Sequence, residues 1–225
     1  MREIVAGRIY TQDSPVRFAG GTLNTRMTVM KLARGVVLHC PVPIDAGLRA
    51  EIAQLGEVTA ILAPSNVHHL FLADAQRAFP DVPTYAVAGL IKKRRDLTLL
   101  PLSDDIFTDE LDRVFIGNPV MHEIVLLDRE SRTVIAVDLV EHIGDATPGM
   151  NRVMRAYIKM MFMWNKPRPA PELRMMTFDR ASARLAIEKI LSWDFDRMVI
   201  AHGELFDTGA KDALREAWRF VHAHG

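Results

Sequence analysis

One stretch near the end of the sequence decides the fold: Trp193-Asp-Phe-Asp-Arg-Met-Val-Ile-Ala-His-Gly203. Its middle part, Arg197 to Ala201, is rich in β-branched and other apolar residues and predicts a buried strand. The strand ends directly in His202 and Gly203. In open α/β sheets, ligands bind outside the carboxyl ends of the strands. The stretch therefore predicts an α/β fold with an imidazole placed where such a fold binds ligands.

Two other apolar runs also lead into ionisable residues. Val58 to Ala63 predicts a strand that is followed by His68 and His69. Thr133 to Val137 predicts a strand that ends in Asp138. Because strand ends on one side of a sheet converge, we expect these side chains to meet, and imidazole with carboxylate suits zinc or iron. The predicted metal ligands are His68, His69, Asp138 and His202.

Each of these residues also has an ordinary structural interpretation. A single histidine after a strand is more often a hydrogen-bonded loop residue than a ligand, and Asp138 is also suited to capping a turn. His68 and His69 serve together only on a turn or at a helix start, because adjacent residues on a strand point to opposite faces. The recurrence at several strand ends favours metal binding.

The other predicted elements complete an α/β pattern. Met27 to Leu32 and Val36 to Cys40 predict a hairpin, and helices are expected from Asp45 to about Leu55, Leu70 to Phe79, Val153 to Trp164, Asp179 to about Trp193 and about Ala210 to His222. The helix around Met160 is apolar on almost every face, so it packs in the core or covers a partner. Pro167, Pro169 and Pro171 predict a stiff, extended connector.

Composition favours one large domain. With 225 residues and 49% hydrophobic content the chain can bury a large core, so we expect a single domain over residues 1–225. Residues 1–26 form an N-terminal extension, either an extra strand or an arm onto a partner. Lys plus Arg and Asp plus Glu are both 28, so no strong field attracts nucleic acid or anionic lipid. The basic run Lys92 to Arg95 is interpreted as a solvated loop.

The cysteine count and the start of the chain bear on location. Cys40 is the single cysteine, which excludes an internal disulfide, and we interpret it as a buried small residue rather than a nucleophile. No segment has the length of a signal-peptide core or the roughly 18 to 20 apolar residues of a membrane span. We therefore expect a cytoplasmic protein that is neither secreted nor inserted in a membrane.

Three stretches resemble a known family. Ala63-Pro-Ser-Asn-Val-His-His-Leu-Phe-Leu72, Ser131-Arg-Thr-Val-Ile-Ala-Val-Asp138 and Trp193 to Gly203 resemble the metallo-β-lactamase superfamily and, more narrowly, its divergent DUF4336 branch. The order of elements is similar as well, and the resemblance covers roughly Thr28 to Val221. It implies a four-layer αββα sandwich of the metallo-β-lactamase type.

The chain departs from the superfamily in its first metal-binding loop. That loop reads His-x-His-x-Asp-His, and the corresponding window here begins with Pro64 and has Asn66 at its second histidine position. Where a further histidine precedes the Glu123 strand, this chain has Asn118, with His122 out of register. The first metal site therefore is expected to be lost. The resemblance implies that a second-metal site survives at His68, His69, Asp138 and His202, with His68 in place of a carboxylate.

The resemblance implies a metal-dependent hydrolase that uses one divalent ion, zinc before iron, to activate water against a small ester, thioester, lactone or phosphoester. Asp138 and Glu204 are the candidate catalytic carboxylates, and Glu123 and Glu204 are candidates for orienting an imidazole or transferring a proton. The expected partner is a small-molecule substrate, without nucleic acid or membrane. Two alternatives remain: a non-catalytic scaffold with a degenerate site that assembles, for example as a homodimer, through the helix near Met160, and a non-haem iron redox enzyme.

Overall fold

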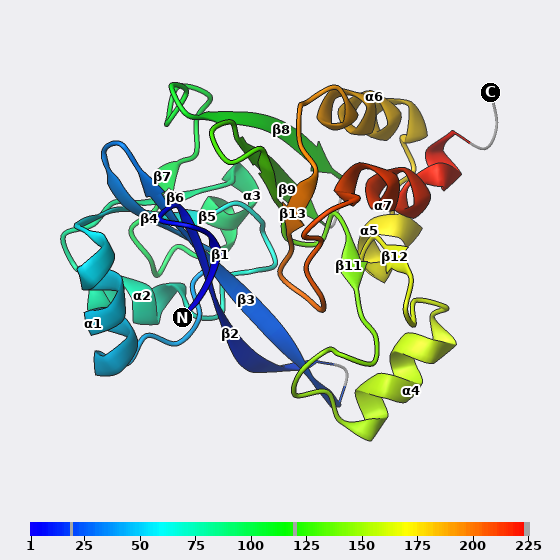
Figure 1. Cartoon of the computed structure of the whole chain (residues 1–225), viewed down its shortest axis with the longest axis horizontal. Coiled ribbons are helices and arrows are strands. Elements are labelled where there is room, and N and C mark those ends of the chain that lie inside the picture. Colours follow the sequence, from blue (N-terminus) through cyan, green and yellow to red (C-terminus); the bar gives the residue numbers. More distant parts are fainter. Residues whose placement is uncertain (19, 119–120, 223–225) are drawn as a thin grey trace. The chain divides into compact units, whose positions relative to one another are not determined.

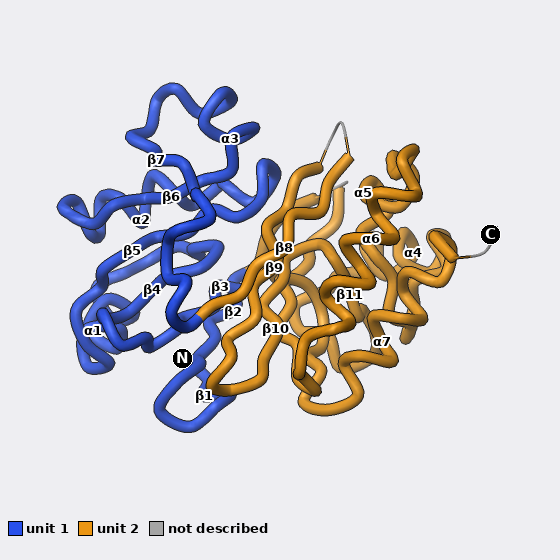
Figure 2. Tube along the Cα trace, turned by 90° about the horizontal axis from the view of Figure 1, so that it is seen from above, with its two compact units in different colours: residues 1–14, 26–110 blue, residues 15–25, 111–225 orange. Residues whose placement is uncertain are grey.

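The computed structural model describes residues 1–18, 20–118 and 121–222 (Figure 1). The chain divides into two compact units, coloured separately in Figure 2. Unit 1 comprises Met1–Ser14 and Arg26–Glu110, and unit 2 comprises Pro15–Thr25 and Leu111–Gly225. Both units are made of strands and helices, as the α/β prediction requires.

Unit 1 is built on a seven-stranded sheet in the order β1-β2-β3-β4-β5-β6-β7. Its strands are β1 Arg2–Val5, β2 Ile9–Phe18, β3 Gly21–Leu32, β4 Gly35–His39, β5 Val58–Ala63, β6 Thr84–Ala86 and β7 Leu100–Pro101, of which β2 and β3 also give residues to unit 2. The β3/β4 hairpin is confirmed, with Leu32 opposite Gly35, and β4 to β7 are parallel. Most of the N-terminal extension is strand within this sheet.

The parallel strands of unit 1 are buried. Val37, Leu38, Ile61 and Leu62 have at most 1% of their surface exposed, which explains why β4 and β5 read as continuous apolar runs. The unit contains helices α1 Ala46–Leu55, α2 Leu72–Ala78 and α3 Ala88–Lys93. Helix α1 begins where the sequence predicts, because the Asp45 carboxylate accepts a hydrogen bond of 2.8 Å from the Leu48 N–H.

Unit 2 contains a four-stranded sheet in the order β13-β10-β9-β8. The strands are β8 Leu111–Gly117, β9 His122–Asp128, β10 Thr133–Ile135 and β13 Arg197–Val199. Neighbouring strands β8, β9 and β10 are antiparallel, whereas β10 and β13 are parallel. A separate two-stranded ribbon pairs β11 Glu141–His142 with β12 Pro167–Arg168.

The helices of unit 2 are α4 Arg152–Met160, α5 Pro171–Met175, α6 Arg180–Leu191 and α7 Ala210–Ala217, followed by a 3-10 turn at Arg219–Val221. Asp179 caps α6 as predicted, accepting from the Ser182 N–H at 3.0 Å. The prediction of an extended connector was wrong at Pro171, which lies in the first turn of α5. Proline is tolerated there because an N–H in the first turn of a helix has no hydrogen-bond partner within the helix. In the part of the chain that the structure describes, no helix has the length and hydropathy to cross a bilayer.

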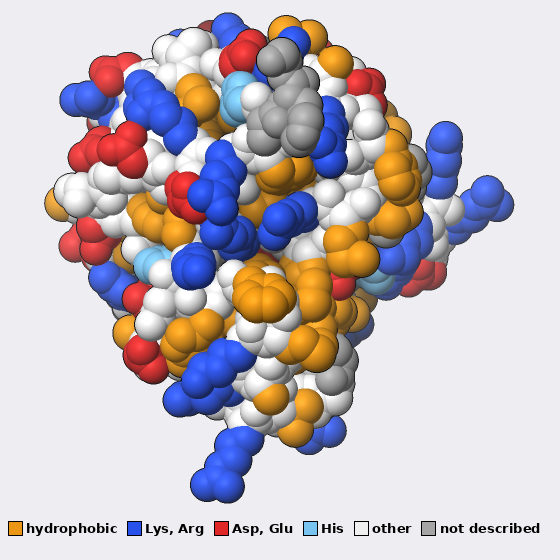
Figure 3. Space-filling model, turned by 90° about the vertical axis from the view of Figure 1, so that its right-hand side faces the viewer, with side chains coloured by type: hydrophobic (Ala, Val, Ile, Leu, Met, Phe, Trp, Pro, Cys, Tyr) orange, Lys and Arg blue, Asp and Glu red, His pale blue; other side chains and the backbone are white. Residues whose placement is uncertain are grey.

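Helix α4 is amphipathic rather than apolar all round. Met154 and Ile158 are buried in a cluster with Leu23, while Met160 and Phe162 have 66% and 79% of their surface exposed. The amphipathic character of α4 could not be predicted from residue type, because methionine and phenylalanine are apolar whether they are buried or exposed. Figure 3 shows hydrophobic side chains exposed beside lysine and arginine side chains on one face of the molecule.

Candidate metal centre

Asp138 and His202 come together at one end of the unit 2 sheet. Strands β10 and β13 are parallel, with Ile135 opposite Val199, and each of the two site residues follows three positions later. His202 Nε2 lies 3.7 Å from Asp138 Oδ1, and both residues are buried. The convergence of these two strand ends, expected from the sequence, is therefore what the structure has.

The ring of His202 is oriented by a hydrogen bond from its Nδ1. Its Nδ1 lies 2.6 Å from the main-chain oxygen of Asn24, on β3, and a carbonyl oxygen only accepts hydrogen bonds. Nδ1 therefore carries a proton that it donates to this carbonyl, and Nε2 is the ring nitrogen nearer to Asp138. Metal-binding histidines in proteins have this arrangement, in which the far nitrogen donates to a fixed acceptor.

Gly203 fixes the turn that follows His202. Its φ of +83° lies in the left-handed region, and a Cβ at this position would lie 2.0 Å from the main-chain oxygen of His142. The Gly203 N–H donates to the side-chain oxygen of Asn24 at 3.0 Å, so Asn24 holds both His202 and Gly203. Steric contact with His142 thus explains why glycine follows His202 in the sequence.

Two predicted carboxylates bind backbone groups. Glu123 is buried and accepts from the N–H groups of Val137, at 2.5 Å, and Asp138, at 2.9 Å, so it orients the end of β10 through the main chain rather than through an imidazole. Glu204 accepts from the Ala146 N–H at 3.2 Å and so holds a nearby loop. A catalytic role for Glu204 stays a prediction.

Glu141 and Tyr157 are unit 2 residues that sequence reasoning missed. Burial, then the charges of Asp138 and Glu172, raises the pKa of Glu141 well above its ordinary value. Burial and the charges of Glu172 and Glu141 also raise the pKa of Tyr157. No sequence pattern marks this cluster, because its members are ordinary residues of β11, α4 and α5.

In unit 1, His69 has the opposite arrangement to His202. The Arg94 guanidinium donates to the main-chain oxygen of His69 and lies 3.1 Å from its Nδ1, while also pairing with Asp96. Burial, then the charges of Lys93 and Arg94, lowers the pKa of His69. A donor on Nδ1 leaves the proton on Nε2, where it blocks metal coordination. Arg94 is therefore an exception to the expectation of a solvated basic loop, and the hydrogen bond does not favour His69 as a ligand.

His39, at the end of β4, is a further histidine that the sequence analysis passed over. It is 1% exposed, and its Nε2 has no hydrogen-bond partner among the described residues. Burial, followed by the charge of His68, lowers its pKa to about 3. His39 is also an ionisable residue at the end of an apolar strand, so the same sequence pattern marks it. The adjacent Cys40 is buried, as expected.

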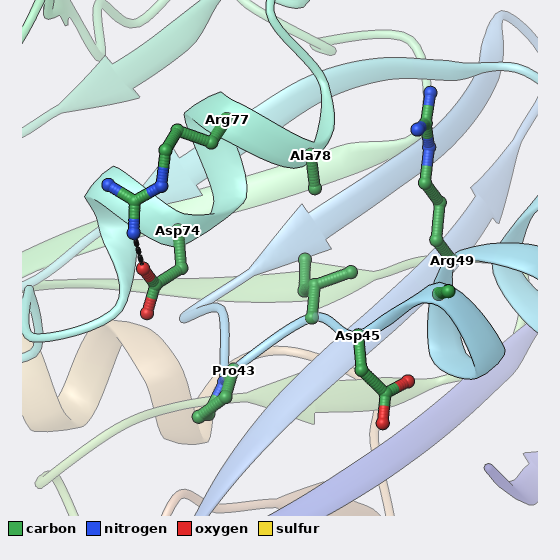
Figure 4. Close-up of a pocket in the computed structure, with 8 residues that line it drawn as sticks. Pro43, Asp45, Arg49, Asp74, Arg77 and Ala78 are labelled. Atoms are coloured by element: carbon green, nitrogen blue, oxygen red, sulfur yellow. Dashed lines mark hydrogen bonds and ion pairs between the residues drawn. The ribbon is translucent and has the colours of Figure 1, made fainter.

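Unit 1 has a surface pocket formed by α1, the segment just before it, and α2. It is lined by Pro43, Ile44, Asp45, Ala46, Arg49, Asp74, Arg77 and Ala78. Figure 4 shows Asp74 turned toward Arg77, with which it forms an ion pair, and Asp45 pointing away from that pair. None of the predicted ligands lines this pocket, and Asp45 is already used as the cap of α1.

Comparison with solved structures identifies the fold. A metallo-β-lactamase from Pontibacter korlensis matches with a TM-score of 0.66 and 14% sequence identity, over 98% of this chain and 97% of that one. A metallo-β-lactamase from Erythrobacter litoralis gives a TM-score of 0.64 at 12% identity, over 97% and 94% of the two chains. The metallo-β-lactamase FIM-1 from Pseudomonas aeruginosa, in a mono-zinc form, gives 0.61 at 12% identity, over 97% and 92%.

No protein-family profile matches the chain, and no curated protein matches it either. At these identities the structural matches establish the fold alone. The chain has the metallo-β-lactamase fold, and the α/β fold class predicted from the sequence is confirmed. The narrower resemblance to the DUF4336 branch stays a prediction.

Proposed function

We propose that this chain is a metal-dependent hydrolase in which Asp138 and His202 of unit 2 hold one divalent cation. The observation that carries the proposal is the pairing of Asp138 with His202, whose Nε2 lies 3.7 Å from the carboxylate while its Nδ1 is held by the Asn24 carbonyl. An imidazole and a carboxylate held this way at a strand end suit zinc more than a harder ion. Iron is the second choice.

The charges of unit 2 fit a bound cation. Burial, and then repulsion by the charges of Asp138 and Glu172, disfavours the ionised form of Glu141. A divalent ion next to Asp138 would offset this repulsion, since bound cations are often the largest local charges in a site. The mono-zinc form of FIM-1 is a precedent for one zinc in this fold.

The residues of the chain have distinct tasks in this proposal. A bound divalent ion supplies Lewis acidity toward an acyl or phosphoryl oxygen and lowers the pKa of water. Asp138 and His202 orient that centre, and Glu123 keeps Asp138 at the end of β10 through two backbone hydrogen bonds. The pKa values of Glu141 and Tyr157 are raised, so in this proposal both side chains would be candidate hydrogen-bond donors to a substrate oxygen. The substrate class is a small ester, thioester, lactone or phosphoester.

Metal analysis of protein purified without chelators tests the proposal. We expect about one equivalent of zinc or iron per chain in the wild type and less than about a tenth in His202→Ala, because one lost ligand reduces affinity by at least the roughly 10- to 100-fold seen for outer-shell changes. His222→Ala is the matched control, since this histidine is partly exposed beside Glu188. A metal-free wild type, or hydrolysis that His202→Ala leaves unchanged, would contradict the proposal.

A scaffold function is the second candidate, and one observation favours it. Met160 and Phe162 expose large apolar side chains at the end of α4, and such surfaces often cover partners. In that case the chain assembles through this face, for example as a homodimer, and the site is structural or empty. Full metal occupancy without any hydrolysis of ester or phosphodiester probes would favour the scaffold over the enzyme.

A further inference from the structure

Residues 146–171 of unit 2 carry a local excess of positive charge. The stretch contains no aspartate or glutamate, whereas its cations are Arg152, Arg155, Lys159, Lys166 and Arg168. Arg168 pairs with Glu216 at 2.9 Å. The other four cations are exposed, and none of them forms an ion pair in the part of the chain that the structure describes. The zero net charge of the whole chain, on which the expectation of no anionic partner rests, therefore does not describe the surface around α4.

Helix α4 separates its cations from exposed apolar side chains. Arg152, Arg155 and Lys159 are spaced three and four residues apart, so they share one side of the helix. Val153 and Met160 are seven residues apart and lie on another side, with 54% and 66% of their surface exposed. The exposed surface of α4 is therefore basic along one edge and apolar along the other, which is typical of helices that lie on a lipid surface.

Phe162 occupies a backbone position that favours glycine. Helix α4 ends in a Schellman motif, in which the Met163 N–H donates to the Ile158 oxygen at 3.1 Å. The Phe162 N–H donates to the Lys159 oxygen, also at 3.1 Å. The φ of Phe162 is +58°, in the left-handed region that glycine adopts without strain and phenylalanine does not. Its side chain is 79% exposed, so packing within the chain does not offset this strain. The strain therefore points to a function for the exposed ring.

Two further aromatic side chains border α4. The Trp164 ring lies 5.0 Å from the Arg155 guanidinium and 4.8 Å from the Lys159 ammonium group. Phe18, at the end of β2 and within unit 2, lies 6.3 Å from the Tyr157 ring and is 48% exposed. The surface defined here as the α4 patch has the apolar members Phe18, Val153, Met160 and Phe162 and the basic members Arg152, Arg155, Lys159 and Lys166.

The charge of the α4 patch disfavours a second copy of this chain as its occupant. In a two-fold dimer the same surface meets itself, so the basic members would face each other without an intervening carboxylate. A membrane made of anionic lipids fits better, because its headgroups attract cations while the hydrocarbon beneath them accepts apolar side chains. We infer that the α4 patch docks this chain reversibly on an anionic lipid surface.

Co-sedimentation with vesicles tests the inference. We expect the wild type to bind phosphatidylcholine vesicles that contain about a third phosphatidylserine. Binding should be at least about tenfold weaker to vesicles of phosphatidylcholine alone, which lack the negative surface potential. It should also weaken at about 0.5 M NaCl, because salt screens the attraction. A wild type that binds neither kind of vesicle would overturn the inference.

A double substitution on α4 tests the basic members. Arg155→Gln combined with Lys159→Gln should weaken binding to the phosphatidylserine vesicles at least about tenfold, since each cation near such a surface contributes about fivefold. The matched control is Arg180→Gln combined with Arg184→Gln, which removes the same charge from α6 and should leave binding within about twofold of the wild type. Thermal unfolding checks that both proteins are folded. Equal vesicle binding by the two double variants would exclude α4 as the docking surface.

Phe162→Gly separates docking from folding. Glycine relieves the left-handed strain, so this variant should unfold at the wild-type temperature or higher. Its binding to the phosphatidylserine vesicles should nevertheless fall about tenfold, because the phenyl ring no longer enters the apolar layer. Leu185→Ser, which changes an exposed apolar residue of α6, should bind as the wild type does. A Phe162→Gly protein that is less stable but binds vesicles normally would make Phe162 a structural residue and contradict the inference.

Tryptophan fluorescence distinguishes a lipid surface from an acidic protein partner. Trp193 and Trp218 are buried, so a blue shift of the emission on adding phosphatidylserine vesicles reports on Trp164, and Trp164→Phe should abolish it. Polyglutamate is the probe for an acidic polypeptide. If the wild type binds polyglutamate but gives no blue shift with vesicles, the partner is an acidic protein and the inference of a lipid surface is wrong.

Discussion

His202 and His69 carry opposite hydrogen bonds on the same ring nitrogen. The carbonyl of Asn24 accepts from His202 Nδ1, whereas Arg94 donates toward His69 Nδ1. Because a neutral imidazole has one donor and one acceptor nitrogen, these contacts decide which ring presents a lone pair at Nε2. The sequence gives the position of each histidine, but the hydrogen bonds that fix the ring come from residues far away in the sequence, as Asn24 is from His202.

A buried carboxyl group gives the first prediction at this scale. Glu141 keeps its proton in the folded state at pH values where the unfolded chain, with an ordinary pKa of 4.5, releases it. The folded state then binds more protons, so stability falls as pH rises above that value. We expect metal-free Glu141→Gln to be more stable than the wild type at pH 7, with the difference shrinking toward pH 4, as measured by urea denaturation.

Glu188→Gln is the control, because its carboxylate is half exposed on α6 and lies near Arg184 and His222. It should change stability by no more than about 0.5 kcal/mol across the same pH range. Equal urea midpoints for Glu141→Gln and the wild type at every pH would show that Glu141 is not held in its protonated form.

The candidate site could be predicted from the sequence only in part. Asp138 and His202 could be predicted because each follows an apolar strand. The parallel pairing of β10 with β13 brings the two residues together. His39 also lies at the end of an apolar strand, β4, but was not among the predicted site residues. Glu141 carried no signal, since its burial arises from tertiary packing and not from any local pattern.

At the scale of elements, Asn24 on β3 holds the turn that carries His202 and Gly203. Asn24 accepts from Gly203 with its side chain and from His202 with its main chain. Asn24→Ala removes the acceptor of a buried N–H and should lower the free energy of unfolding by about 1 to 3 kcal/mol. Equilibrium denaturation measures this loss, and Asn24→Asp, which keeps a side-chain acceptor, should recover part of it. An Asn24→Ala protein as stable as the wild type would mean that water replaces the lost acceptor.

Helix α4 provides a second prediction for an element. Met160 and Leu185 have 66% and 63% of their surface exposed, on α4 and α6 respectively, so neither substitution to glutamate should change stability by more than about 0.5 kcal/mol. If chains assemble through α4, Met160→Glu should reduce the mass measured in solution by light scattering, and Leu185→Glu should not. A dimer that survives Met160→Glu would exclude α4 from the interface.

The elements that the sequence predicted well have strong local signals. Asp45 and Asp179 both cap the helices expected from them, and Val58 to Ala63 forms β5 over its predicted length. The short helices α3 and α5 were missed. Helix α5 follows closely spaced prolines, which are typical of extended chain, and its single turn is too short to show helical periodicity.

At the scale of the whole molecule, a bound cation should contribute to stability. Binding to the folded state alone stabilises it by about 2.7 kcal/mol when the free ion is at 100 times its Kd. Removal of metal with a chelator should therefore lower the unfolding temperature, and added zinc should restore it. The same treatment of His202→Ala should have no effect. An unfolding temperature that ignores both chelator and zinc would argue against a site that couples metal to folding.

The backbone at position 203 restricts which residues can be accepted there during evolution. Any side chain at this position meets the His142 carbonyl at 2.0 Å and also requires a left-handed backbone, so neither a rotamer change nor a small residue relieves the conflict. In a library that samples all twenty amino acids here, selection for folded protein should return glycine codons alone. The neighbouring His202 could then drift, through loss of metal, long before Gly203 does, and lineages that abandon the chemistry would still carry the glycine.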